Sequence, residues 1–327
     1  MASLQAHLLS FVLRQTLKRC LGRANPRYAR ALLEALKFPP PADLDISQLQ
    51  LGGVPTERLQ RPSGEIHSDM LYLHGGGYVA CSARTHRPVT IAFARSGFRV
   101  FAANYRLAPE NPFPAAVEDA VAAYRALRAA DDAERPVVIA GDSAGGGLAV
   151  ATMIKLRDEG DPLPAAAALF SPFTDFAGGG ESRCRNDARC AMFHGKNFGR
   201  ATDLYMAGAD PRNPLASPVY GDLTGLPPML IHVGSNETLL DDSTRLAALA
   251  ESAGVPVELK IWPAVPHAWQ VFQRLIPEGR QSLREAADFL HQAVTASTPR
   301  LTEAVRSSLP QPTSRPRSAY STDLKRT

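Results

Sequence analysis

The sequence predicts an α/β fold in which helices cover both faces of a mostly parallel central sheet. Between residues 68 and 290, short runs of β-branched and apolar residues alternate with longer helical stretches. This alternation is typical of parallel strands joined by crossover helices. The chain has 327 residues, 45% of them hydrophobic, which is enough to bury one large core. Ligands bind such sheets at the carboxyl ends of the strands, so we expect the functional site there.

Six strands and several helices make up this alternation. The predicted strands are Met70–Leu73, Arg99–Asn104, Val137–Ala140, Ala167–Phe170, Met229–Val233 and Val257–Trp262. The predicted helices include Thr85–Ser96, Ala115–Ala130, Gly146–Arg157 and Ser243–Ala253.

Two regions break the rhythm and define the domain organisation. Residues 1–44 and the irregular, proline-bearing stretch 174–215 are predicted to form a cap over the carboxyl edge of the sheet, because inserted stretches of this length are usually lids or binding elements. Residues 45–173 and 216–296 are assigned to the core. Residues 297–327 are polar and contain prolines, so we expect a disordered tail.

Charge and cysteine content exclude several classes of protein. The net charge of +4 is accounted for by the tail alone, so the body has no basic excess typical of a nucleic-acid binder. The four cysteines, which lack CxxC spacing, are interpreted as reduced thiols of a cytosolic protein. A bridge between Cys184 and Cys190 stays open, because these two are close in sequence.

The N-terminal segment is predicted to be a helix rather than a secretory signal or a membrane span. No apolar run approaches the roughly 18 residues of a span, and no basic leader precedes the apolar part. Apolar residues recur at helical steps at Leu4, Leu8, Phe11, Val12 and Leu17. We expect this stripe to pack on the domain; the alternative is a basic amphipathic helix that touches a membrane surface. The sequence also leaves homo-oligomerisation open.

One serine lies on a tight bend between a predicted strand and a predicted helix. The stretch PVVIAGDSAGGGLAV, residues 136–150, contains the G-x-S-x-G pattern from Gly141 to Gly145, with Ser143 at its centre. Small residues on both sides let the bend form without Cβ clashes and expose the hydroxyl at the edge of the sheet. The alternative, a phosphate-binding turn, is disfavoured because the spacing is not G-x-G-x-x-G and no Walker lysine follows. Ser143 is therefore a candidate nucleophile.

A serine nucleophile needs a base, and one of the eight histidines has the right position. His267, in the loop PAVPHAWQ, follows the last predicted strand and so lies at the same edge as Ser143. His232 is inside a predicted strand, which suggests a core or edge position. His7 and His291 are on predicted helices.

The imidazole in turn needs a carboxylate to fix its tautomer. The stretch HVGSNETLLDDS offers Glu237, Asp241 and Asp242. Helical periodicity resumes at Ser243, so Asp241 or Asp242 is well placed to cap that helix. We favour Glu237 as the acid, with Asp241 as the main competitor.

Backbone amides that could bind an oxyanion follow the first predicted strand. In LYLHGGGYV, three consecutive glycines, Gly75, Gly76 and Gly77, let amides approach a substrate oxygen closely. The residue after the nucleophile, Ala144, adds a further N–H.

Taken in order, these motifs resemble those of the hormone-sensitive-lipase-like esterases of the α/β-hydrolase fold. The family motifs HGGG, YRLAPE, GDSAGG, a late acidic loop and PH[AG][FW] correspond to His74–Gly77, Tyr105–Glu110, Gly141–Gly146, the loop at Glu237 and Pro266–Trp269. The resemblance spans roughly residues 45 to 292.

The resemblance implies a role for each matching residue. Ser143 would be the nucleophile, His267 the base, and the amides of Gly76, Gly77 and Ala144 the oxyanion donors. The family's acidic loop often reads D-P-L-x-D where this chain has ETLLD, so the acid aligns with a glutamate, Glu237. A helical cap, built from the N-terminus and an insertion after the sixth strand, is also implied.

The expected function is therefore that of a serine carboxylesterase that hydrolyses short- to medium-chain acyl esters through an acyl-enzyme. The expected substrate is a small-molecule ester, with lactones left open, and no metal or cofactor is required. One alternative is a non-catalytic small-molecule receptor on the same fold. Another is a membrane-recruited lipase.

Overall fold

The computed structural model contains one eight-stranded, mostly parallel sheet. The structure describes residues 2–21, 30–31, 34, 38–130, 135–195 and 198–308. The strands are β1 Asp45–Leu51, β2 Val54–Gln60, β3 Ser68–Leu73, β4 Phe98–Ala103, β5 Val137–Asp142, β6 Ala167–Phe170, β7 Met229–Gly234 and β8 Val257–Trp262. Their order is β1-β2-β4-β3-β5-β6-β7-β8; the pairs β1–β2 and β2–β4 are antiparallel, and the other neighbours are parallel. The predicted α/β fold is confirmed.

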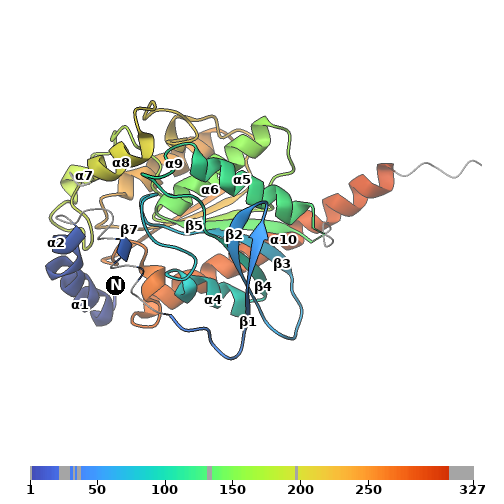
Figure 1. Cartoon of the computed structure of the whole chain (residues 1–327), viewed down its shortest axis with the longest axis horizontal. Helices are drawn as coiled ribbons and strands as arrows, with labels where there is room; N and C mark the ends of the chain where they lie inside the picture. The colour runs from blue at the N-terminus through green and yellow to red at the C-terminus, as the bar shows by residue number, and fades with distance from the viewer. Residues whose placement is uncertain are drawn as a thin grey trace, which may run out of the picture.

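Helices cover both faces of this sheet (Figure 1). The helices are α1 Leu4–Gln15, α2 Leu17–Leu21, α4 Arg87–Arg95, α5 Ala115–Arg128, α6 Ala144–Asp158, α7 Ser182–Arg185, α8 Phe198–Met206, α9 Leu240–Ser252 and α10 Pro277–Ser308, with 3-10 turns η2 Pro218–Tyr220 and η3 Trp269–Phe272. One face packs against α5, α6 and α9, and the other against α4 and α10.

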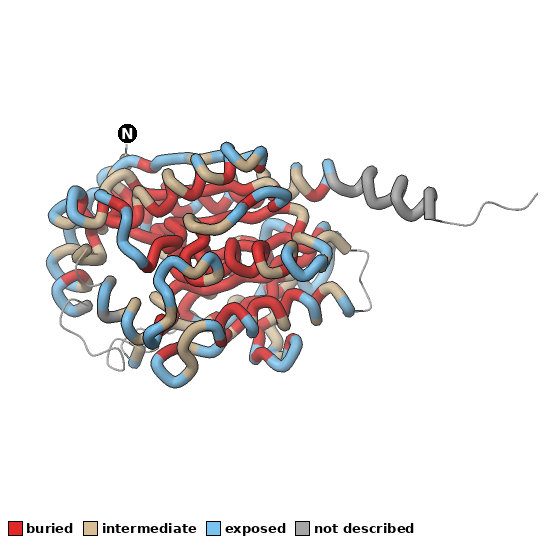
Figure 2. Tube along the Cα trace, turned by 90° about the horizontal axis from the view of Figure 1, so that it is seen from above, coloured by how far each residue is buried: buried red, intermediate tan, exposed pale blue. Residues whose placement is uncertain are grey.

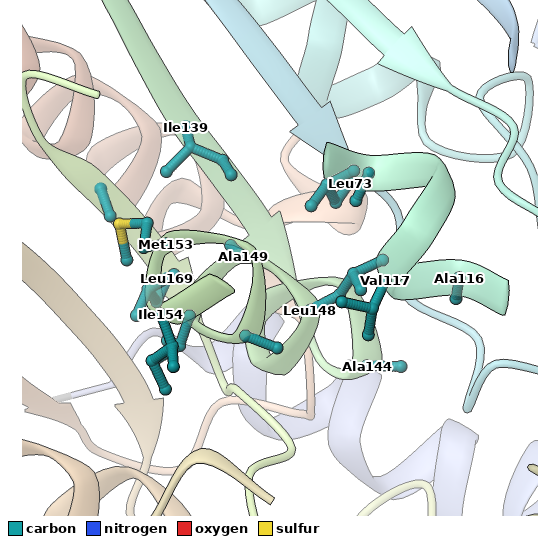
Figure 3. Packing of buried hydrophobic residues seen from close by; sticks show 14 of the residues in the cluster. Leu73, Ala116, Val117, Ile139, Ala144, Leu148, Ala149, Met153, Ile154 and Leu169 are labelled. Carbon is teal, nitrogen blue, oxygen red and sulfur yellow. The ribbon is translucent and has the colours of Figure 1, made fainter. Parts of the chain in front are cut away.

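The core is split by the sheet into two apolar layers. Successive strand residues point to opposite faces, so Leu71 and Ile139 join the layer under α6, whereas Tyr72 and Val138 join the layer under α4 and α10. Buried positions accordingly run through the middle of the molecule (Figure 2). Figure 3 shows how closely α6 packs on β5, with Ala149 among larger side chains.

Several elements differ from the sequence prediction in presence or extent. The hairpin β1–β2 precedes the first strand that the sequence predicted, and α9 begins at Leu240 rather than Ser243. Helix α10 continues past residue 296 to Ser308, and the rest of the predicted tail, residues 309–327, lies outside the described residues. Parts of the segment 1–44 also lie outside them.

The N-terminal helix is present, but its orientation contradicts the expectation. The large apolar side chains of the predicted stripe at Leu4, Leu8, Phe11 and Val12 are exposed, and α1 packs on the body through its smaller residues and Leu13. Helical periodicity shows that one face is apolar, but it does not say which way that face points.

Two further expectations concern cysteines and membrane spans. All four cysteines are free thiols, so the bridge between Cys184 and Cys190 is not formed. Among the described residues, none of the helices is both long enough and apolar enough to cross a membrane.

Candidate active site

Ser143 occupies the turn between β5 and α6 in a backbone conformation that L residues rarely adopt. Its φ is 53° and its ψ is −121°. The turn is fixed on both sides, because the Ser143 amide donates to Phe170 O at 2.8 Å and the Ser143 carbonyl accepts from the Phe173 amide at 2.8 Å. A Cβ on Gly145 would lie 2.0 Å from Leu73 O, so only glycine fits where α6 crosses β3. These contacts hold the serine at the carboxyl edge of the sheet.

His267 lies in the loop after β8 and is almost fully buried. Its Nδ1 donates to Glu237 Oε2 over 2.5 Å. Its other ring nitrogen, Nε2, has no hydrogen-bond partner among the described residues. The imidazole is therefore oriented by one nitrogen while the other remains available to a reacting group.

Glu237 is positioned by the loop after β7 and is also buried. Its Oε1 accepts from Ser171 Oγ at 2.7 Å and from the Gly234 amide at 2.6 Å, while Oε2 faces His267. The sequence did not single out Ser171, which directly follows β6 at the same edge. A polar residue immediately after a buried strand was the only available signal.

The competing carboxylates have other partners. Asp241 accepts from the Ser182 amide at 2.8 Å and from Arg185 at 2.9 Å. Asp242 accepts from the amides of Thr174 and Asp175, at 2.9 Å and 3.0 Å. The expectation that they cap α9 is therefore wrong: both lie in its first turn, but they bind amides of the inserted segment instead. Burial raises the pKa of Asp242 to about 7.

The glycine loop after β3 adopts a conformation that other residues would not tolerate. Gly76 and Gly77 have φ values of 124° and 64°, and a Cβ on Gly76 would lie 2.0 Å from Ala80 O. In the described part of the chain, neither amide donates to a backbone carbonyl. Ala144, the third candidate donor, is the first residue of α6, where helix amides are free and the helix dipole favours negative charge.

A buried aspartate that the sequence analysis did not assign holds this loop to the serine turn. Asp142 precedes the serine and accepts from the Gly75 amide at 3.0 Å, from Tyr72 at 2.7 Å and from His86 Nε2 at 3.2 Å. Burial acts to raise the pKa of Asp142, but the charge of His86 and the hydrogen bonds outweigh it, and the pKa is lowered. The carboxylate thus stays ionised and ties the two loops together.

His74, at the start of the glycine loop, is kept neutral. Burial, reinforced by the charge of His86, lowers its pKa to about 4. Its ring stacks on Tyr105 with centroids 4.4 Å apart, and the Tyr105 hydroxyl donates to His74 O at 2.6 Å. Tyr105, the tyrosine of the YRLAPE stretch, therefore holds the start of the glycine loop in place through His74.

The loops after β3, β5, β7 and β8 thus carry, at one edge of the sheet, the groups that acyl transfer requires. These groups are a hydroxyl on a strained turn, an imidazole held by a carboxylate, and free backbone amides. Among the described residues, no cluster of three or more histidines, cysteines or carboxylates could hold a metal ion.

Comparison with known proteins gives the family. Residues 70–271, more than half of the chain, match the model of a protein family described as having the alpha/beta hydrolase fold. The chain belongs to the α/β-hydrolase family.

Individual relatives place this α/β-hydrolase among esterases. It is 48% identical to an acetyl-hydrolase of Streptomyces hygroscopicus over 71% of this chain and 78% of that protein. It is 32% identical to an esterase of Acinetobacter venetianus, over 81% and 88% of the two chains. The solved structure of EstE5 matches with a TM-score of 0.85 at 37% identity, covering 90% of this chain and all of that one.

A solved esterase of the bacterial hormone-sensitive lipase family gives a similar result. Its TM-score is 0.82 at 41% identity, over 90% of this chain and 99% of the other. The resemblance to hormone-sensitive-lipase-like esterases is therefore confirmed, and this α/β-hydrolase is a carboxylic-ester hydrolase. The alternative of a non-catalytic receptor is set aside.

Proposed function

We propose that the protein hydrolyses short- to medium-chain acyl esters by a serine mechanism in which Ser143, His267 and Glu237 act together. The observation that carries this proposal is the 2.5 Å contact between His267 Nδ1 and Glu237 Oε2, which leaves Nε2 as a base. Glu237 is favoured over Asp241 because both oxygens of Asp241 bind the inserted segment.

In the first half-reaction, Ser143 Oγ attacks the ester carbonyl carbon while His267 Nε2 takes the hydroxyl proton. The carbonyl oxygen becomes an oxyanion, to which the amides of Gly76, Gly77 and Ala144 donate. The C–O bond to the alcohol then breaks, and the alcohol leaves with the proton from His267. Glu237 stabilises the imidazolium that forms in between.

In the second half-reaction, water attacks the acyl-enzyme carbonyl as His267 Nε2 takes one of its protons. The bond to Ser143 Oγ breaks, the serine regains its proton from His267, and the carboxylic acid is released. A lactone would follow the same steps, except that the leaving alkoxide stays tethered to the acyl group.

The preference for small acyl groups rests on contacts made by the inserted segment 174–215, which we propose acts with residues 1–44 as a cap. The Phe193 ring meets the His267 ring edge-on, with centroids 5.0 Å apart. A Cβ built on Gly77 would lie 3.7 Å from the Cβ of Ala201 in α8. The insertion therefore reaches both the base and the glycine loop, and on this proposal it limits the room for an acyl chain beside Ser143. The name of the Streptomyces relative, an acetyl-hydrolase, supports the same preference.

The decisive test measures hydrolysis of p-nitrophenyl acetate, butyrate, octanoate and laurate, and of γ-butyrolactone, by wild type and Ser143→Ala. We expect turnover to be highest for acetate or butyrate and lowest for laurate. Ser143→Ala should lower kcat by about 10⁶-fold on every ester.

A fluorophosphonate probe provides a second readout of the serine mechanism. Mass spectrometry of the labelled wild type should place the adduct on Ser143. A fully active Ser143→Ala variant, or an adduct on another residue, would overturn the serine assignment. Fastest turnover of laurate would overturn the proposed acyl preference alone.

A further inference from the structure

The short segment at the end of β6 contacts both the serine turn and the acidic loop. Strand β6 lies between β5, which leads to Ser143, and β7, which leads to the loop of Glu237. The carbonyl of Phe170, the last residue of β6, accepts from the Ser143 amide at 2.8 Å. The next residue, Ser171, donates from its amide to His232 O at 2.7 Å and from its hydroxyl to Glu237 Oε1 at 2.7 Å. Two adjacent residues therefore contact the candidate nucleophile on one side and the candidate acid on the other.

Ser171 makes these contacts from a strained backbone conformation. Its φ is 47°, in the left-handed region that serine rarely adopts and that glycine adopts without steric cost. The side chain is fully buried. The turn by itself would accept a glycine, so the path of the backbone does not explain a side chain at this position. The hydrogen bond that the hydroxyl makes to Glu237 does explain it, and strained residues of this kind cluster at functional sites.

The hydroxyl acts on one oxygen of the Glu237 carboxylate and leaves the other oxygen to His267. Glu237 Oε1 accepts from Ser171 Oγ and from the Gly234 amide at 2.6 Å, whereas Oε2 lies 2.5 Å from His267 Nδ1. The glutamate folds back over the end of β7, because a Cβ on Gly234 would lie 3.1 Å from Glu237 Cγ. A glutamate side chain has one more rotatable bond than an aspartate, so fixing its carboxylate in one orientation costs more entropy. Two donors on Oε1 supply the contacts that offset this cost.

We propose that Ser171 is a positioning residue, whose hydroxyl orients the Glu237 carboxylate so that Oε2 faces His267 Nδ1. Without the hydroxyl, a buried carboxylate oxygen loses a donor and the carboxylate gains rotational freedom. The imidazole is then held less often in the orientation that lets Nε2 act as the base. This loss should lower kcat rather than raise KM, because Ser171 acts through Glu237. The proposal rests on the proposed function, in which Glu237 is the acid.

Steady-state kinetics of Ser171→Ala and Ser171→Gly on p-nitrophenyl acetate tests the positioning role. Both variants should lower kcat by about 10- to 100-fold, the scale of a hydrogen bond to a charged group, with KM within about twofold of wild type. Thermal unfolding should separate the two variants, because glycine relieves the backbone strain that alanine retains, and Ser171→Gly should melt higher. An equal loss of kcat in two variants of different stability would follow the missing hydroxyl and not the folding of the chain.

A double-mutant cycle with Glu237→Gln shows which residue Ser171 acts through. In the Glu237→Gln background, adding Ser171→Ala should change kcat by less than about twofold, because no carboxylate is left to orient. A merely structural effect would multiply with the loss caused by Glu237→Gln. Ser182→Ala is the matched control, because Ser182 is equally buried and its hydroxyl donates at 2.9 Å to Thr238 O in the same loop. It should lower the melting temperature while keeping kcat within a few-fold of wild type.

The outcomes separate this proposal from the proposed function. Wild-type kcat in both Ser171 variants, together with a strongly impaired Glu237→Gln, would overturn the positioning role and leave the proposed function intact. Losses that multiply in the double variant, or an equal loss of kcat in Ser182→Ala, would also overturn it. A fully active Glu237→Gln would instead remove Glu237 as the acid, and the positioning role with it.

Discussion

The loops that carry the candidate site and the segments predicted to cover it are held in place by different kinds of contact. The loops are fixed by buried groups of the sheet itself, above all by Asp142, which joins the Gly75 amide to His86. The inserted segment shares one buried contact of this kind, because Asp242 accepts from the amides of Thr174 and Asp175. Elsewhere the covering segments are held by long cationic side chains that reach carbonyls and carboxylates. Lys18 Nζ donates to Cys190 O at 3.0 Å, and Arg30 Nε donates to Val79 O at 2.9 Å.

This difference implies different consequences of mutation. Removing one partner of a buried, hydrogen-bonded pair leaves an uncompensated polar group, which costs several kcal/mol or displaces the loop. Removing an exposed ion pair costs about 0–1 kcal/mol. We therefore expect changes in the loops to act on catalysis, and changes at the edges of the cap to act weakly on stability.

The largest difference should separate the two carboxylates of the acidic loop. Glu237→Gln should lower kcat by about 10⁴-fold, because the amide no longer fixes the His267 tautomer or stabilises the imidazolium. Asp241→Asn, which faces the inserted segment, should keep kcat within a few-fold of wild type. Steady-state kinetics on p-nitrophenyl acetate measures both. Equal activity of the two variants would contradict the assignment of either as the acid.

The buried aspartate before the serine should have the next largest effect. Asp142→Asn weakens the ties to Gly75 and His86, so the glycine loop shifts and kcat should fall by about 10²-fold, the scale of a lost oxyanion donor. Asp69→Asn is the matched control, because Asp69 is equally buried but pairs with Arg99 at the opposite end of β3. It should reduce the melting temperature while leaving kcat near wild type. A similar kcat loss in both variants would show a general effect of buried charge.

One buried group in each region should make stability depend on pH, and the two dependences should run in opposite directions. His74 in the glycine loop has its pKa lowered to about 4. As the pH falls from about 6.5 to 4, His74 is therefore protonated in the unfolded chain but stays neutral in the folded chain. Its contribution to stability is lost over that fall. Asp242 under the insertion has its pKa raised to about 7, so its contribution is present below about pH 4 and is lost as the pH rises to 7.

Thermal unfolding across this range measures both contributions. The free energy of unfolding of His74→Gln should fall less steeply than that of wild type as the pH is lowered. That of Asp242→Asn should fall less steeply than that of wild type as the pH is raised to neutral. Each change in slope should be at most about 1.4 kcal/mol per pH unit. Parallel curves for all three proteins would contradict both directions.

The smallest effect is expected at the exposed edge of the insertion. Arg185 is half exposed and pairs with Asp241 at 2.9 Å. Arg185→Ala should lower the free energy of unfolding by less than about 1 kcal/mol, with kcat unchanged. A kcat loss beyond tenfold would show that this contact positions the site and would remove the distinction between the two regions.

The sequence predicted those features that depend on local chemistry. The strand before Ser143, the small residues around it and the glycine loop are readable because a tight bend and close backbone approach permit few residue types. The hairpin β1–β2 was not readable, because its first strand is largely polar and half-exposed, without a buried run. The choice between Glu237 and Asp241 depends on where the inserted segment lies in the fold. The spacing of residues along the chain carries no information about that position.

The strained turn at Ser143 has a consequence for selection. A serine held at a φ of 53° and a ψ of −121° costs about 1–3 kcal/mol, which a glycine at the same position would largely avoid. A laboratory population screened only for folded protein should therefore drift toward glycine at 143. Only a screen that requires ester hydrolysis would preserve the hydroxyl, so the fold and the chemistry make conflicting demands on this residue.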